Sequence, residues 1–283
     1  MRIGFVTCVQ LGLSCMEAIY QAGGHLELAV TLPKDKARAK SGRVYIDDFC
    51  ARHRIPLVKS PHVGDDGVVQ AIRSSGLDWL FIVGWSQIAP QRVLEAPKRG
   101  VLGMHPTLLP EGRGRASIPW AILKGLPCTG VTLFKLDEGV DTGPILAQES
   151  VAISDRETAR TLYDKINVAH QDLIRRVWDD LVTDRIRLQP QDDSQATTWS
   201  ARRPQDGRID PQSMTVAEID QLVRAVTDPY PGAFLDTADA RVRIWSGSPL
   251  PSAARCGSYS IEARDGTYYA VNYAFENVAT SEE

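Results

Sequence analysis

The histidine at position 105 is a residue whose type and setting could do chemistry. It lies within 101–120, VLGMHPTLLPEGRGRASIPW, between an apolar strand-like run and a loop rich in glycine and proline. A second loop, LDEGVDTG, carries the acids Asp137, Glu138 and Asp141. A histidine backed by a carboxylate is the usual acid–base pair, because the acid fixes the tautomer and stabilises the protonated ring. Spacing alone leaves two readings of His105: half of such a pair, or a loop histidine hydrogen-bonded to backbone.

The sequence shows no pattern for a metal site or a disulfide framework. Its cysteines are odd in number, none is spaced CxxC, and most lie in apolar runs; they are Cys8, Cys15, Cys50, Cys128 and Cys256. Buried free thiols in a reducing compartment are the expected state. No HExxH motif or Cys/His cluster predicts a metal, and we find no P-loop and no GxGxxG motif.

Alternating strands and helices must position the two loops. Short apolar runs alternate with helical patterns through the first half of the chain: strands are expected at 2–9, 26–32, 55–60, 79–85 and 100–108, and helices at 13–23, 45–54, 65–76 and 90–98. This order predicts a mostly parallel sheet wrapped by helices. Active sites in such sheets lie beyond the carboxyl ends of the strands, where His105 falls.

Two further strands, at 129–137 and 143–153, are expected on either side of the acidic loop. After them, Ser154 and Glu157 have the S-x-x-E spacing of a capping box. An apolar stripe follows, formed by Leu162, Ile166, Leu173, Val177 and Leu181. Together they predict a long helix that runs to about residue 183 and closes the first domain.

The composition changes after this helix and predicts three parts. We expect a catalytic domain at 1–186, a polar linker at 187–208 and a small, mostly β accessory domain at 209–283. The last part begins with an amphipathic helix at 215–226. Four short strands follow, the last two joined at Asp265-Gly266, a hairpin signal.

Charge and composition narrow the function classes. Hydrophobic residues are 43% and charged residues 24% of the 283 positions, as in an ordinary globular protein, and the net charge is −3. Residues 201–283 hold eight arginines, no lysine and twelve acids, so this part carries a net charge of −4. The chain therefore has no general bias toward nucleic acid. No signal peptide or membrane-spanning run is evident, so a cytoplasmic location is expected.

Several motifs in order resemble the folate-dependent formyltransferase family. They are HPTLLPEGRGRASIPWAILKG, beginning at His105, and TGVTLFKLDEGVDTGPILAQ, which contains Asp141; the two residues are 36 positions apart. Further on, VRAVTDPYPGAF and VRIWSG are similar to the start of the accessory β domain of methionyl-tRNA and sugar-nucleotide formyltransferases. The resemblance covers most of the chain and is weakest at its C-terminal end. It implies a Rossmann-like catalytic domain that moves a formyl group from 10-formyltetrahydrofolate to an amine.

The resemblance also implies roles for individual residues. His105 is expected to be the catalytic histidine and Asp141 its acid. The pterin of the co-substrate is expected to lie between two segments, which contain Trp85, Ser86, Gln87 and Ile88, and Leu136, Asp137, Glu138, Gly139 and Val140. A flat pterin needs an apolar slot with polar groups on its rim, which Trp85 and Ile88 could wall. The reaction also needs a donor for the charge that develops on the formyl oxygen.

The sequence departs from the family at Gly103, two residues before the histidine, where the family carries an asparagine. Losing one oxyanion donor typically costs roughly 10²–10³ in rate. The Gly103 backbone, Thr107, Gln87 or a water molecule could replace the missing amide. If the site is otherwise family-like, we expect open space beside Gly103.

The acceptor amine is not fixed by these motifs. Arg113 and Arg115 lie beside His105 and could bind the diphosphate of a nucleotide-linked amino sugar, together with Thr107 in the acceptor site. A tRNA acceptor could use the basic stretch that contains Lys34, Lys36, Arg38, Lys40 and Arg43, although a solvated loop is the favoured reading of that stretch.

The leading hypothesis is therefore an N-formyltransferase for a nucleotide-linked amino sugar. The alternatives are a methionyl-tRNA formyltransferase, a 10-formyltetrahydrofolate hydrolase and an inactive folate-binding relative. No membrane partner is expected, and a monomer and a homodimer are both compatible with the sequence.

Overall fold

The computed structural model describes residues 1–37, 42–253 and 257–277. They form two compact units, each assembled from separate stretches of chain. Unit 1 comprises Met1–Gly114, Cys128–Ala152 and Asp164–Trp199, and unit 2 comprises Arg115–Pro127, Ile153–Tyr163 and Ser200–Glu283. This division differs from the expected one in two ways: the first residues of the expected linker, as far as Trp199, belong to unit 1, and Arg115–Pro127 and Ile153–Tyr163, inside the expected catalytic domain, belong to unit 2.

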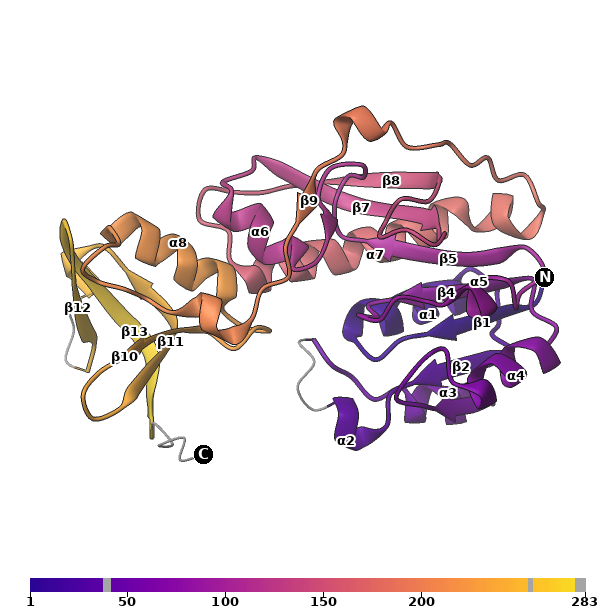
Figure 1. Ribbon diagram of the computed structural model, residues 1–283, viewed down its shortest axis with the longest axis horizontal. Coiled ribbons are helices and arrows are strands. Elements are labelled where there is room, and N and C mark those ends of the chain that lie inside the picture. The colour runs from indigo at the N-terminus through magenta and orange to yellow at the C-terminus, as the bar shows by residue number, and fades with distance from the viewer. Residues whose placement is uncertain (38–41, 254–256, 278–283) are drawn as a thin grey trace. The chain divides into compact units, whose positions relative to one another are not determined.

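Unit 1 is built on a seven-stranded sheet with the order β3-β2-β1-β4-β5-β7-β8 (Figure 1). Its strands are β1 (Ile3–Val6), β2 (Leu28–Thr31), β3 (Leu57–Lys59), β4 (Trp79–Val83), β5 (Gly100–His105), β7 (Cys128–Lys135) and β8 (Ile145–Ala152). The first five pair in parallel, whereas β7 pairs antiparallel with both β5 and β8. The predicted mostly parallel sheet is confirmed.

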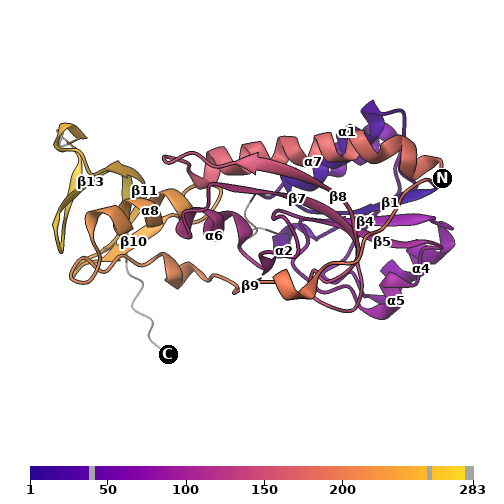
Figure 2. The same cartoon turned by 90° about the horizontal axis from the view of Figure 1, so that it is seen from above.

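Helices cover both faces of this sheet, as Figure 2 shows: α1 and α7 lie on one face, and α4 and α5 on the other. The helices of unit 1 are α1 (Gln10–Gln21), α2 (Lys34–Ala37), α3 (Asp47–His53), α4 (Asp66–Ser74), α5 (Gln91–Leu94) and most of α7 (Ala159–Val182). Because both faces are covered, the central strands β1, β4 and β5 are buried along their whole length. A small ladder, β6 (Arg113–Gly114) with β9 (Thr198–Trp199), was not expected from the sequence.

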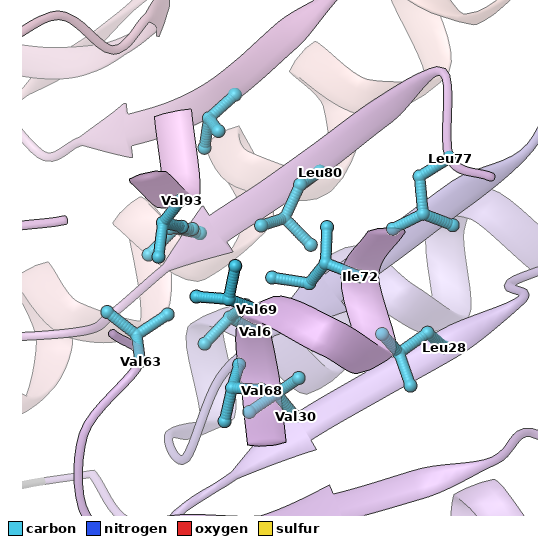
Figure 3. Packing of buried hydrophobic residues seen from close by; sticks show 12 residues of the cluster. Val6, Leu28, Val30, Val63, Val68, Val69, Ile72, Leu77, Leu80 and Val93 are labelled. Atoms are coloured by element: carbon cyan, nitrogen blue, oxygen red, sulfur yellow. The ribbon is translucent and has the colours of Figure 1, made fainter. Parts of the chain in front are cut away.

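The hydrophobic core on the α4 and α5 face reaches the carboxyl edge of the sheet (Figure 3). In it, Val68 and Ile72 of α4 meet the strand residues Val6 and Leu80. Partly buried residues that pack against this core include Trp85 and Leu136. Both come from loops that the sequence analysis assigned to the co-substrate, so one core supports both loops.

The long helix α7 begins later than its capping motif predicted. Glu157 accepts hydrogen bonds from the backbone and hydroxyl of Ser154, at 3.0 and 3.1 Å, but these close a turn ahead of the helix. The helix itself starts at Ala159, where the Thr158 hydroxyl accepts from the Thr161 N–H at 3.2 Å. The predicted end and the buried stripe are confirmed, because α7 ends at Val182 and all five stripe residues are buried.

Unit 2 joins helices to a four-stranded antiparallel sheet with the order β10-β11-β13-β12. Its elements are α6 (Ser117–Leu123), α8 (Val216–Val226), β10 (Ala233–Asp236), β11 (Arg241–Ser248), β12 (Tyr259–Ala263) and β13 (Gly266–Glu276). The predicted hairpin is present, with Ala263 paired to Gly266. The sequence analysis missed α6, whose Pro119 lies in the first turn, where its missing N–H breaks no helical bond.

The thiols only partly match expectation. Cys8, Cys15 and Cys50 are buried thiols outside any disulfide, whereas Cys128 is exposed at the start of β7; Cys256 lies outside the described residues. Across residues 1–37, 42–253 and 257–277, no helix is both long and apolar enough to span a bilayer.

Candidate active site

The carboxyl end of β5 places His105 at the edge of the unit 1 sheet, and backbone holds its ring. Its Nε2 lies 2.8 Å from the Gly112 carbonyl oxygen. Since a carbonyl only accepts, Nε2 carries the hydrogen, and Nδ1 is left to accept a proton. The expectation that the acid fixes the tautomer is therefore corrected, because Gly112 does so.

The acid predicted to partner His105 lies beside its other ring nitrogen. Asp141 Oδ2 is 3.6 Å from His105 Nδ1, and both side chains are largely buried. The same oxygen accepts a hydrogen bond from the Gly114 N–H at 2.9 Å. At this distance the carboxylate stabilises an imidazolium when Nδ1 takes a proton. The other two acids of the loop make different contacts. Asp137 accepts hydrogen bonds from the Gly139 N–H and the Thr142 hydroxyl, which stabilise the fold of the loop, and Glu138 is exposed.

The Gly-Arg-Gly sequence after His105 works through its backbone. Gly112 has φ +71° and Gly114 has φ +110°, and a Cβ on Gly114 would lie 2.3 Å from the Trp199 carbonyl oxygen. Only glycine fits this conformation without strain. The motif thus turns one carbonyl toward His105 and one N–H toward Asp141.

A glutamine from the expected linker braces the acid from behind. Gln191 Nε2 donates to the backbone oxygens of Asp141 and Gly143, at 2.8 and 2.7 Å. Gln191 Oε1 accepts from Arg113, whose guanidinium also bonds Asp193 at 2.7 Å. The sequence analysis missed Gln191, because a lone glutamine in a polar segment carries no periodic or motif signal.

These contacts bear on the residues predicted to bind the acceptor. Arg113 is buried, and its guanidinium donates hydrogen bonds to Gln191 and Asp193. It thereby supports Gln191, which in turn holds the acid loop, the segment 136–143 that carries Asp141. Arg115 is exposed and begins the first segment of unit 2. Binding of an acceptor phosphate by either residue stays a prediction.

The expectation of open space beside Gly103 is wrong. Gly103 lies in β5 and pairs with Phe134 of β7. A Cβ there would meet Leu136 Cδ2 at 2.6 Å and Phe134 Cε1 at 3.4 Å. Leu136 therefore fills the place of the family's asparagine side chain, since apolar groups close-pack and leave little room for water.

Among the candidate replacement donors, Thr107 has a buried hydroxyl without a hydrogen-bond partner in the described part of the chain. Its backbone is fixed at both ends: the N–H donates to His105 O at 2.9 Å, and the carbonyl accepts from Thr132 at 2.7 Å. Gln87 is engaged instead, because its amide bonds Pro61, Val63 and Trp85.

The two segments predicted to hold the pterin leave apolar groups uncovered. Ile88 is 70% exposed and Val140 is 50% exposed, although Ala89 in the first segment and Leu136 in the second pack against the core. Gln87 ties the first segment to the loop at Pro61 and Val63, with Trp85 Nε1 donating to the same amide oxygen at 3.3 Å. Exposed aliphatic side chains on a hydrogen-bonded loop suit a flat, partly apolar ligand.

An acid–base pair at the carboxyl edge of an α/β sheet, beside a braced loop, is an arrangement that can take a proton from a nucleophile. Residues 15–177 match the formyl transferase family and residues 202–282 match the formyl transferase C-terminal domain. The chain belongs to the formyl transferase family, and the predictions of a formyltransferase and of its fold are confirmed. This family uses formyltetrahydrofolate as the formyl donor.

Individual relatives differ in the acceptors their names state. The chain is 30% identical over 248 residues to a methionyl-tRNA formyltransferase of Lachnospira eligens, covering 87% of this chain and 78% of the relative. It is 33% identical over 250 residues to that of Thermodesulfovibrio yellowstonii, covering 88% and 80%. Among solved structures, WlaRD, a sugar 3N-formyltransferase determined in the presence of dTDP and 5-N-formyl-THF, has a TM-score of 0.68 at 16% identity and covers 99% of this chain and 98% of its own. This last likeness shows the fold.

Proposed function

We propose that the protein transfers the formyl group of 10-formyltetrahydrofolate to the amino group of a nucleotide-linked sugar. The observation that carries the proposal is the His105 ring, held at Nε2 by Gly112 and facing Asp141 with Nδ1. The co-substrate supplies the formyl group, and Ile88, Val140 and the backbone of 136–140 would hold its pterin. The remaining chemistry belongs to the side chains at the end of β5.

The attacking amine must lose a proton as its nitrogen bonds the formyl carbon. His105 Nδ1 is the ring atom left to accept that proton, and Asp141 at 3.6 Å stabilises the resulting positive charge. The bond from the formyl carbon to the folate nitrogen must then break, and the proton held by His105 would pass to the leaving nitrogen. The two nitrogens of the imidazole therefore have separate tasks: Nε2 is held by the backbone of Gly112, and Nδ1 takes the transferred proton. A neutral amine bound near Nδ1 would find the general base already oriented.

The formyl oxygen gains negative charge during the same step. Thr107 offers the hydroxyl for it, because this hydroxyl is buried and unpartnered within the described residues, two positions from His105. A hydroxyl donor in a buried site stabilises developing charge strongly, since little solvent screens it. The proposal assigns Thr107 the task of the family's asparagine.

Charge in unit 2 supports a small acceptor over a polynucleotide. Six of its arginines pair with acids: Arg156 and Arg224 with Asp220, Arg160 with Asp228, Arg208 and Arg241 with Asp236, and Arg243 with Glu276. Paired guanidinium groups contribute little to counterion release from an RNA backbone. Methionyl-tRNA stays the second candidate, because relatives at 30% and 33% identity bear that name.

A panel of acceptors tests the assignment. Purified protein is given 10-formyltetrahydrofolate with UDP- and dTDP-linked amino sugars, with charged initiator tRNA, or with water alone, and product masses are measured. A formamide on an amino sugar is expected, at a rate that falls about 10²–10³-fold in Thr107→Val. Formylation confined to the tRNA, or formate release at the same rate without any amine, would reject the proposed acceptor.

A further inference from the structure

Arg43 is fixed at the carboxyl end of the central strand β1. It pairs as a bridge with Val9, and the neighbouring Val44 N–H donates to Cys8 O at 3.1 Å. On the other side, the Gln10 N–H at the start of α1 donates to Gly42 O at 2.7 Å. This residue was expected to belong to a solvated loop, yet its backbone is bonded to the strand end and the helix start.

The guanidinium of Arg43 has no ion-pair partner within residues 1–37, 42–253 and 257–277. Its Nε and Nη2 atoms are buried and have no hydrogen-bond acceptor among the described residues. Acids of the same segment are engaged by lysines, Asp35 by Lys36 and Asp47 by Lys59, and no ion pair joins Arg43 to Asp47, whose Oδ2 is buried. A buried cation without a partner is costly, so the group is arranged for an anion that arrives from outside.

A second cation and an aromatic ring complete the cluster. The Arg43 Cζ lies 3.7 Å from the centroid of the Tyr45 ring, and the Lys34 Nζ lies 5.6 Å from the same centroid. Tyr45 is 50% exposed, and its contact with Arg43 holds the guanidinium plane in one orientation. A guanidinium fork with a nearby ammonium suits phosphate oxygens that carry more than one charge.

The cluster lies at the switch point of the sheet. Strand β1 pairs with β2 on one side and β4 on the other, so the chain direction of the crossovers reverses between β1 and β4. Cys8, after β1, contacts the Gly84 carbonyl, after β4, at 4.0 Å. Ligands of open parallel sheets bind beyond the carboxyl ends of the strands at such a point. His105, at the end of β5, is on this same edge.

We propose that Arg43, with Lys34 and Tyr45, binds the diphosphate of the acceptor nucleotide. The inference rests on the proposed function for the identity of the acceptor, and on the unpaired guanidinium for the site. It replaces Arg113, which Gln191 and Asp193 already engage, as the residue that recognises the phosphate. Acceptor binding and formyl donor binding are thereby served by different loops at one sheet edge.

Binding measured without any folate separates this site from catalysis. UDP, dTDP and charged initiator tRNA are titrated by calorimetry into the unmodified protein and into Arg43→Gln, Arg43→Lys, Tyr45→Leu and a matched control, Arg73→Gln. Arg73 is exposed in the last turn of α4, at the opposite edge of the sheet. Melting temperatures show whether each variant is folded, and Arg43→Lys keeps a cation at the site if Arg43→Gln unfolds.

The dissociation constant for UDP or dTDP is expected to rise roughly 10- to 100-fold in Arg43→Gln and less in Arg43→Lys, because a charge-assisted bidentate contact is lost or weakened. Arg73→Gln should bind as the unmodified protein does. The inference is overturned if neither nucleotide binds, if Arg43→Gln and Arg73→Gln bind alike, or if Arg43→Gln weakens only initiator tRNA. Arg43-dependent nucleotide binding without formylation of any amino sugar would uphold the site and reject the proposed acceptor.

Discussion

At the scale of single residues, the proposed mechanism gives the two ring nitrogens of His105 different tasks, because Nε2 lies against the Gly112 carbonyl and Nδ1 faces Asp141. Replacing His105 by Ala removes the proton acceptor, and Asp141→Asn removes the charge that stabilises its protonated form. Each change should lower kcat by at least about 10²-fold, the usual worth of a positioned general base. Steady-state kinetics with a circular dichroism control test this, and Asp141→Asn working at full rate would remove Asp141 from the mechanism.

A second prediction at the scale of single residues concerns Gly103, where steric packing rather than charge determines the effect of a substitution. Gly103→Asn should lower stability and activity, because its Cβ would lie 2.6 Å from Leu136 Cδ2. A double variant, Gly103→Asn with Leu136→Ala, should recover at least part of the loss, since the shorter side chain frees the position. Thermal unfolding and turnover of the two single variants and the double variant give the coupling, and additive losses would contradict the packing argument.

At the scale of elements, the segment that ends in β9 braces the acid loop through Gln191. Gln191→Leu leaves the carbonyls of Asp141 and Gly143 without their donor, which typically costs about 1–3 kcal/mol of stability. It should also lower kcat more than it changes KM, because the acid is displaced from His105. Gln189→Leu is the matched control, since Gln189 is exposed and pairs with Ile145 through its backbone. Equal effects on stability and kcat in the two variants would show that Gln191 has no specific role in holding the loop that carries Asp141.

Helix α7 carries a buried histidine that makes stability depend on pH. Burial lowers the pKa of His170 to about 4, below its ordinary value of 6.5, and its Nε2 has no hydrogen-bond partner in the described residues. The unfolded chain therefore takes up a proton at a higher pH than the folded chain. The stabilisation is complete above about pH 6.5 and falls as the pH drops toward 4.

Between pH 7 and pH 5 this histidine should cost about 2 kcal/mol of the free energy of unfolding. His170→Leu should remove that part of the pH dependence, whereas replacing the exposed His62 by Gln should not. Urea unfolding at both pH values measures the difference. A slope unchanged by His170→Leu would place the pH dependence elsewhere.

At the scale of the whole molecule, donor binding should stabilise the folded chain. A folate analogue at a hundred times its dissociation constant should add about 2.7 kcal/mol, because it binds the native state alone. Val140→Asp should reduce the shift in melting temperature by placing a charge in the apolar slot. Val168→Asp, at an exposed valine on α7, should leave it unchanged. No shift at millimolar analogue in any form would contradict a folate site.

The sequence by itself determined most elements of unit 1 and predicted His105 and Asp141 as an acid–base pair. Strand and helix periods are local, so the order of elements in unit 1 and the stripe on α7 could be read from the sequence. His105 and Asp141 were predicted because the motif fixes their order and the topology of a parallel sheet puts strand ends at one edge. The glycine at 103 was also visible as a departure from the family.

Only the tertiary structure decided what surrounds those residues, because contacts between distant segments leave no period in the sequence. Leu136 fills the place beside Gly103, and Gln191 reaches the acid loop from 50 positions further along the chain. The sequence alone does not distinguish Arg113 from Arg43. In the structure, however, the Arg113 guanidinium donates hydrogen bonds to Gln191 and Asp193. Two nitrogens of Arg43 are buried without an acceptor among the described residues. Burial and ion pairing depend on tertiary contacts between segments that are distant in the sequence. For a charged side chain, those contacts decide whether it supports a loop of the protein or is left to bind a ligand.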